Sequence, residues 1–85
     1  MNATQKILAE MGAIPSMLRG TLSEQRRTKG GRAYYSLQRW VDGRNDAKYV
    51  PADKAAFVRG QVRNYRRFMR LVERYVRAAE KNSKF

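Results

Sequence analysis

The feature that most constrains this chain is a long stretch with helical periodicity in its C-terminal part. Between Pro51 and about Lys81 there is no further proline, and Gly60 is the only other residue that disfavours a helix. Pro51 suits the first position of a helix, and Asp53 suits the positive end of the helix dipole. A helix over residues 51–82 would be roughly 45 Å long at about 1.5 Å per residue, which is more than a small sheet can cover.

This predicted helix has two contrasting sides. Its apolar residues fall within about half of the circumference. They are Phe57, Val58, Val62, Tyr65, Phe68, Met69, Leu71, Val72, Tyr75, Val76 and Ala79. Its cations fall within an arc of about 100° on the other side, and Glu73 and Glu80 lie at the border of that arc. We call these cations the arginine stripe: Arg59, Arg63, Arg66, Arg67, Arg70, Arg74, Arg77 and Lys81.

The arginine stripe is unusual for a helix face that only meets water. Solvated faces typically alternate acids and bases, because opposite charges four residues apart stabilise a helix and like charges destabilise it. The stripe repeats the unfavourable pairing, for example between Arg63 and Arg67. Guanidinium groups also pair with phosphate through two parallel hydrogen bonds. The stripe therefore favours phosphate binding, with a solvated face or an acidic protein partner as the alternatives.

The overall composition supports an anionic partner. The chain has 85 residues, enough for one small domain, and its nineteen Lys and Arg against seven Asp and Glu give a formal net charge of +12. With no Cys and no His, thiolate and imidazole catalysis and the usual zinc sites are excluded. We expect no enzyme activity, no cofactor and no metal. No apolar run is long enough to span a membrane, so we expect a soluble cytoplasmic protein. The helix needs its apolar half to cover a sheet, so we expect no binding to a membrane surface.

The rest of the chain predicts an α+β domain. Residues 1–18 form an N-terminal helical segment, which Asn2 or Thr4 can cap and whose regular part Gly12 and Pro15 end. Residues 19–50 form an antiparallel meander of three strands, over 21–27, 33–41 and 47–50, with a hairpin turn at Asp42-Gly43. Alternation places Tyr35, Leu37 and Val41 on a face suited to the core.

Two further groups are candidate contacts to nucleic acid. Four cations surround the predicted turn at Gly30-Gly31, where they could reach a phosphate backbone or lie on an unpartnered hairpin. They are Arg26, Arg27, Lys29 and Arg32. Tyr34 and Trp40 share the strand face opposite the core face, where they could stack on bases. If that face assignment is inverted, both aromatic side chains belong to the core.

Two other patterns leave alternatives open. Asp46-Ala47-Lys48 after Asp42 has the D-x-K form of metal-dependent nucleases, but both aspartates also suit a hairpin turn. Along the helix, apolar residues follow a heptad-like spacing at 58, 62, 65, 69, 72, 76 and 79. The C-terminal half of the helix could therefore pair with a second copy to form a homodimer, or pack on the N-terminal helix of the same chain.

Four short segments resemble a family of short basic prokaryotic proteins of unknown function, often encoded near mobile-element genes. The segments are 19–25 (RGTLSEQ), 34–37 (YYSL), 49–51 (YVP) and 64–68 (NYRRF), and the resemblance covers Leu18 to Tyr75. Many members have cysteines after the S-E-Q segment, where this chain has Thr28-Lys29-Gly30-Gly31, so a metal role does not carry over. The meander followed by a helix is also similar to the arm-binding domains of phage-type integrases, whose sheet enters the DNA major groove.

These observations predict a non-enzymatic module that binds DNA or RNA, as an accessory of a mobile-element or phage nucleoprotein complex that could include a protein partner. The alternative is an adaptor or inhibitor that docks on an acidic protein surface. A small Mg²⁺-dependent nuclease is the third possibility.

Overall fold

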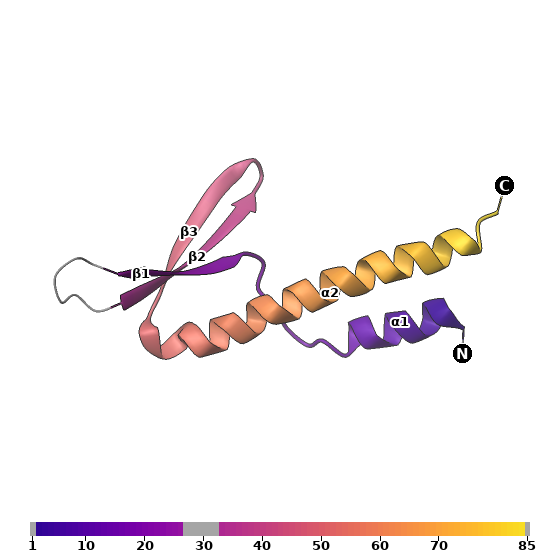
Figure 1. Cartoon of the computed structure of the whole chain (residues 1–85), viewed down its shortest axis with the longest axis horizontal. Coiled ribbons are helices and arrows are strands. Elements are labelled where there is room, and N and C mark those ends of the chain that lie inside the picture. Colours follow the sequence, from indigo (N-terminus) through magenta and orange to yellow (C-terminus); the bar gives the residue numbers. More distant parts are fainter. Residues whose placement is uncertain (1, 27–32, 85) are drawn as a thin grey trace.

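The computed structural model describes residues 2–26 and 33–84, without the side chains of residues 25, 26 and 33. Figure 1 shows a short helix, a three-stranded sheet and a long helix. The elements are α1 (Ala3–Gly12), β1 (Thr21–Arg26), β2 (Ala33–Val41), β3 (Arg44–Val50), a 3-10 turn (Ala52–Lys54) and α2 (Ala55–Lys81). The predicted α+β class is confirmed.

Helix α1 begins with a complete capping box. The Asn2 side chain accepts a hydrogen bond from the backbone N–H of Gln5 at 2.9 Å, and the Gln5 side chain accepts one from the backbone N–H of Asn2 at 3.3 Å. Asn2 is therefore the cap, while Thr4 donates to the Asn2 side chain at 2.8 Å. The helix ends at Gly12, as predicted, and residues 13–18 lead to the sheet.

The sheet is an antiparallel meander with the order β1-β2-β3. A two-residue loop joins β2 to β3, with positive φ at Asp42 (51°) and Gly43 (74°), as a type I′ turn requires. Val41 consequently pairs with Arg44, and β3 begins three residues before the predicted Ala47. The turn at Asp42-Gly43 is confirmed, but the predicted start of β3 at Ala47 was wrong, because the tight turn lets pairing begin at once.

The main core lies between the sheet and the first part of α2. Leu37, Val50, Val58 and Val62 are buried there, and Leu18, Leu22 and Tyr35 pack against them. This contact confirms the core face of β2 at Leu37 and Tyr35, whereas Val41 is only half-buried and lies outside this cluster. The backbone enters β1 through Gly20 at φ 136°, where a Cβ would lie 2.7 Å from the carbonyl oxygen of Gln38. Glycine is needed at this crossing.

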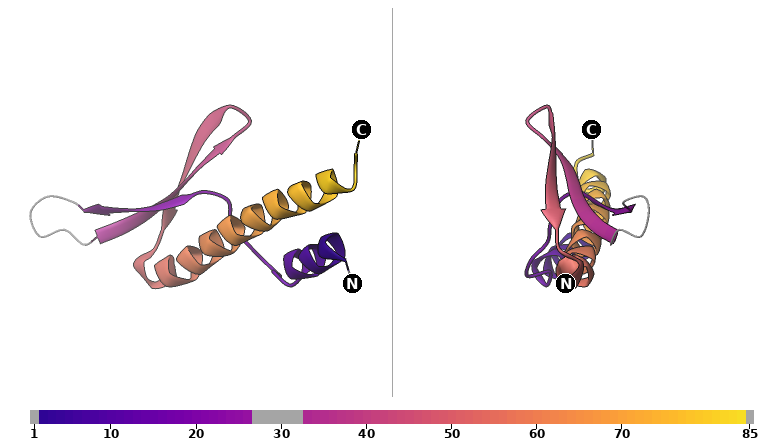
Figure 2. Two further views of the ribbon diagram at one scale, coloured as in Figure 1. Left: turned by 45° about the vertical axis from the view of Figure 1, so that its right-hand side comes forward. Right: turned by 90° about the vertical axis from the view of Figure 1, so that its left-hand side faces the viewer.

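Beyond the sheet, α2 continues without a break and α1 packs along its C-terminal half (Figures 1 and 2). Ile7 of α1 and Leu71 of α2 are buried, although neither belongs to the core beneath the sheet. The molecule is consequently elongated, measuring 61 × 27 × 16 Å. None of the helices in the described part of the chain is both long and apolar enough to cross a membrane.

Candidate nucleic-acid interface

The arginine stripe lies on the exposed surface of α2. All eight side chains are exposed to solvent. From Arg59 to Lys81 the stripe is about 33 Å long at 1.5 Å per residue, close to the length of one turn of duplex DNA at roughly 34 Å. Because one regular helix holds all the residues, their spacing is rigid. The stripe is therefore a preformed row of cations.

Most of the stripe has no counter-charge among the residues that the structure describes. Arg74 Nη1 lies 3.7 Å from Glu10 Oε2, and Arg77 Nε donates to Glu73 Oε1 at 3.2 Å. Within residues 2–26 and 33–84, the other six stripe cations form no ion pair. Glu10 Oε2 is itself buried and accepts no hydrogen bond in the described structure, so Arg74 is its only electrostatic partner there. The free cations are those that can meet an external anion.

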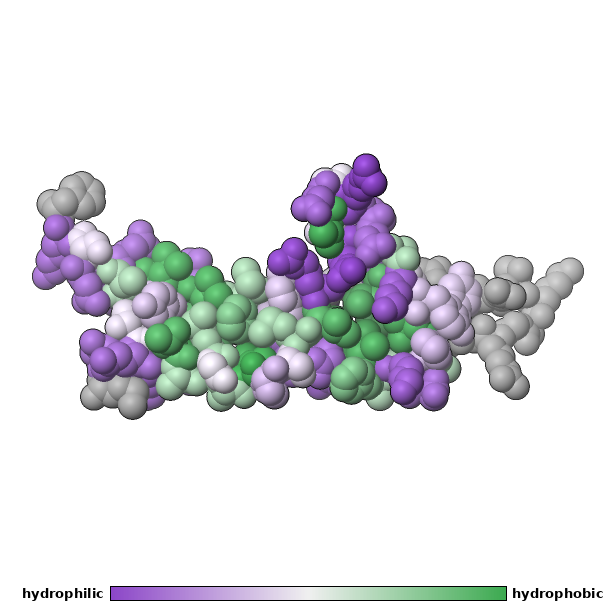
Figure 3. Space-filling model, turned by 180° about the vertical axis from the view of Figure 1, so that it is seen from behind, coloured by the Kyte–Doolittle hydropathy of each residue, from purple (hydrophilic) through white to green (hydrophobic). Residues whose placement is uncertain are grey.

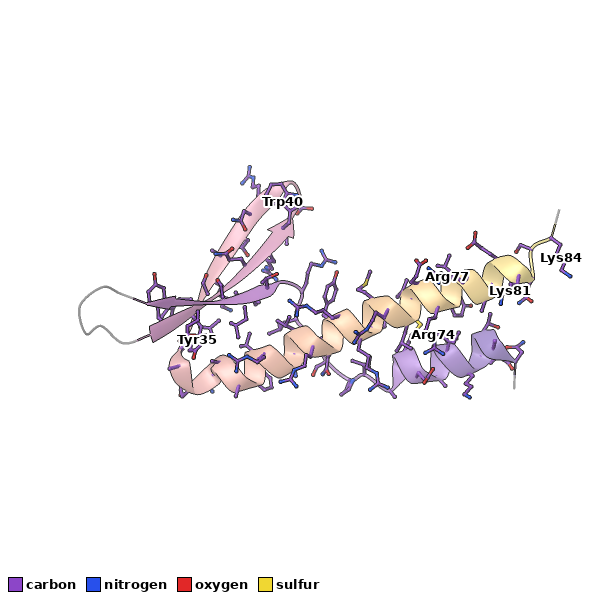
Figure 4. All side chains as sticks on the ribbon, in the orientation of Figure 1. Tyr35, Trp40, Arg74, Arg77, Lys81 and Lys84 are labelled. Atoms are coloured by element: carbon purple, nitrogen blue, oxygen red, sulfur yellow. The ribbon has the colours of Figure 1, made fainter. Side chains whose placement is uncertain are left out.

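Residues 59–70 of the stripe occupy a flank of α2 that neither packing contact uses, whereas Arg74, Arg77 and Lys81 line a hollow together with residues of α1. At about 100° per residue, the sheet-facing residues Ala55, Val58 and Val62 lie roughly 100° around the helix from the centre of the stripe. Leu71, on the side of α1, lies about 90° away in the other direction. Figure 4 shows Arg74 at the edge of this flank, close to α1, with Arg77 and Lys81 further along the helix. A linear polyanion could thus run along residues 59–70 of the stripe without displacing any element.

The outer face of the sheet, which points away from α2, has a different character. Strand alternation and register place only uncharged residues there among the described side chains. They are Thr21, Ser23, Tyr34, Ser36, Gln38, Trp40, Asn45, Ala47 and Tyr49. Trp40 is 68% exposed and Tyr49 is 64% exposed. This face offers aromatic surfaces and neutral hydrogen-bonding groups.

Two of these aromatic side chains form a pair. The rings of Tyr34 and Tyr49 have centroids 6.3 Å apart and planes tilted by 33°. Tyr49 is not among the predicted site residues, although alternation along β3 would have placed it beside Tyr34 once the hairpin register was known. Figure 4 shows Trp40 near the far end of the β2–β3 hairpin. The structure thus joins Tyr34 to a second tyrosine and leaves Trp40 apart from them.

The cations predicted around Gly30-Gly31 cannot be placed. Arg27, Lys29 and Arg32 lie outside the described residues, as does the side chain of Arg26 at the end of β1. The candidate interface therefore consists of the stripe and the outer face of the sheet.

The carboxylates of the D-x-K pattern have structural roles. Asp46 Oδ2 accepts a hydrogen bond from Arg39 Nε at 3.0 Å across the β2–β3 pair. Asp42 occupies the first position of the turn, with φ of 51°. Groups of three or more acidic residues able to hold a metal ion are absent from the described part of the chain. The pattern thus gives no further support to the nuclease hypothesis.

Comparison with family models, curated proteins and solved structures finds no match. The resemblance to the basic prokaryotic family remains a prediction, and the function must be argued from this molecule alone.

Proposed function

We propose that this protein is a non-enzymatic nucleic-acid-binding module that holds the phosphate backbone with the arginine stripe. The observation that carries the proposal is a row of six exposed cations on one rigid helix flank, which form no ion pair with any described residue. As in the sequence-based prediction, we propose that it acts in the cytoplasm as an accessory of a mobile-element or phage nucleoprotein complex.

The arrangement of the stripe favours phosphate over a purely solvated surface. Neighbours such as Arg59 and Arg63, or Arg66 and Arg70, are four residues apart on α2, where like charges destabilise a helix by about 0.2–0.5 kcal/mol per pair. An anion lying along the flank would remove this repulsion. Phosphates repeat along a nucleic-acid strand, so a single backbone can neutralise several arginines and release their counterions.

The outer face of the sheet supplies the second half of the proposal. Its neutral surface can approach bases without a charge having to be desolvated, and Trp40 can stack on an unpaired base. The stripe and this face point in directions about 100° apart around α2. We propose that the stripe provides affinity for any sequence and that the sheet contacts bases.

A direct test uses fluorescence anisotropy with labelled duplex DNA, single-stranded DNA and single-stranded RNA, each over a series of salt concentrations. The variant Arg63→Gln/Arg70→Gln removes two unpaired cations from the centre of the stripe. We expect weaker binding on every sequence. The slope of log K against log salt should fall in magnitude by about 1.8 on a duplex or about 1.4 on a single strand, for two lost phosphate contacts.

The matched control is Lys6→Gln/Arg44→Gln, which removes the same net charge from two exposed residues on α1 and β3. We expect its salt slope to stay close to that of the wild-type protein. Equal losses in both variants would show that net charge alone drives binding. A wild-type protein that binds none of the three probes would refute the proposal.

A second candidate function, docking on an acidic protein surface, is favoured by one groove. It lies between the inner face of the hairpin and the start of α2. Apolar residues and three cations line it. The apolar residues include Leu37, Pro51 and Phe57, the last of which is 64% exposed, and the cations are Arg39, Lys48 and Lys54.

The two functions can be separated with a synthetic peptide that alternates glutamate and leucine. Under the second function, the peptide binds the wild-type protein and Arg63→Gln/Arg70→Gln equally, and Phe57→Ser abolishes binding. If Phe57→Ser has no effect on peptide binding, the groove is not a docking site.

A further inference from the structure

The monomer exposes more surface than a chain of this mass usually does. Its accessible surface is 7079 Å², whereas the size scaling for monomeric proteins gives about 5,200 Å². Its radius of gyration is 17.5 Å, against about 12 Å for a compact chain of this length. None of the described side chains is completely enclosed. The excess area exceeds the roughly 800 Å² that each partner buries in a standard interface.

Part of the exposed surface is apolar and lies on the C-terminal half of α2. We call it the apolar seam: Phe68, Met69, Val72, Tyr75, Val76 and Ala79. Met69 and Val76 are each 43% exposed, and Leu8 of α1, a further apolar residue near this half of the molecule, is 54% exposed. Figure 3, seen from behind, shows apolar surface extending along the two helices beyond the sheet. The seam is thus partly exposed, with Met69 and Val76 exposed and Phe68, Val72, Tyr75 and Ala79 half-buried.

The connection from α1 to β1 explains where the seam begins. It crosses α2 one to two turns earlier, where the backbone N–H of Leu18 donates to the Gln61 carbonyl at 3.0 Å and the Asn64 side chain donates to the Ser16 carbonyl at 3.0 Å. The first heptad positions, Val58 and Val62, are buried beneath the sheet. Of the predicted heptad pattern, Met69, Val72, Val76 and Ala79 remain beyond this crossing.

Charge along one edge of the seam points to the partner. Arg66 lies on this edge before the seam, and Glu73 lies on the same edge one heptad later, with Glu80 a further heptad on. In an antiparallel pair of identical helices, this edge of one helix lies beside the same edge of the other, which runs in the opposite direction. Arg66 of each copy therefore meets Glu73 of the other. The opposite edge, with Phe68 and Tyr75, then faces its own copy through aromatic rings. In a parallel pair, the charged edge would face the uncharged edge.

We infer that the apolar seam docks a second copy of this chain, with the two α2 helices antiparallel. Met69 of one copy packs against Val72 of the other, and Arg66 of each copy pairs with Glu73 of the other at both ends of the contact. The centre of the arginine stripe lies about 170° around α2 from the seam, so every stripe cation except Arg66 stays exposed on the dimer. The inference rests on the seam and its edge charges and does not depend on the proposed function.

Sedimentation equilibrium over a wide range of protein concentrations tests this inference, on protein freed of nucleic acid. We expect reversible dimerisation. Met69→Gln/Val76→Gln should weaken it by about tenfold or more, since Met69 lies at the centre of the contact and Val76 lies near each of its ends. Both side chains are already 43% exposed, so the monomer should keep its helical circular dichroism. The matched control is Phe57→Gln, an exposed apolar residue of α2 outside the seam, which should dimerise like the wild-type protein.

A charge exchange tests the antiparallel arrangement. Arg66→Glu and Glu73→Arg should each weaken the dimer, because like charges then meet at both ends, and the double variant should restore wild-type association. If the double variant is no better than the single ones, the antiparallel pairing is wrong. A wild-type chain that is monomeric at every concentration, or equal weakening by Phe57→Gln, overturns the inference. A monomer would mean that a different partner covers the seam.

Discussion

The repulsion within the arginine stripe gives a prediction about stability. In the double variant Arg63→Gln/Arg70→Gln, each substitution removes two like-charge pairs four residues apart. The pairs are 59–63, 63–67, 66–70 and 70–74. At about 0.2–0.5 kcal/mol per pair, the free energy of unfolding should rise by roughly 0.8–2 kcal/mol at low salt. Glutamine has nearly the helix propensity of arginine, so propensity contributes little to this change.

Urea unfolding followed by circular dichroism measures this gain, at low salt and again at about 1 M salt. The Debye length falls from about 10 Å at 0.1 M to about 3 Å at 1 M, so the gain should nearly vanish at the higher concentration. The same variant should bind nucleic acid more weakly. Higher stability together with weaker binding would indicate that the stripe is retained for binding at the expense of stability.

Arg74→Gln is the informative contrast because Arg74 has a partner. The substitution removes one like-charge pair. It also removes the guanidinium that lies 3.7 Å from Glu10 Oε2, a buried atom that accepts no hydrogen bond in the described structure. We expect no gain, or a loss of up to about 1 kcal/mol. If Arg63→Gln/Arg70→Gln shows no gain at low salt, or a gain that persists at about 1 M salt, the argument from charge repulsion is wrong.

Three further substitutions test other parts of the molecule. Gly20→Ala should lower the free energy of unfolding by about 1–3 kcal/mol in urea, because φ of 136° is strained for any other residue; unchanged stability would contradict this. Trp40→Ala should weaken single-strand binding by about 1–3 kcal/mol in anisotropy. The melting temperature of this variant should change little. A steep fall in melting temperature with unchanged binding would show that Trp40 stabilises the fold and does not contact bases. Asn2→Ala should cost about 1 kcal/mol in thermal unfolding, and Asn2→Asp should retain the cap.

Local signals in the sequence were enough to predict most of the secondary structure and the stripe. The helix over 55–81 follows from its period and the lack of proline, β2 matches the predicted span, and Asp42-Gly43 forms the predicted turn. The stripe follows from residue spacing alone, because a regular helix fixes the direction of every side chain. The start of β3 depended on the register that the turn imposes, which the strand pattern did not reveal.

The sequence by itself determined that α2 has a cationic side and an apolar half. Only the tertiary structure decided how that apolar half is divided: Val58 and Val62 meet the sheet, Leu71 is buried on the side of α1, and Met69 and Val76 stay exposed. The helical periodicity could not predict this division. It gives the direction of each side chain around the helix axis, but not where along the axis the sheet and α1 lie. The physical reason is length, because α2 extends beyond the sheet and must find a second packing partner on another side.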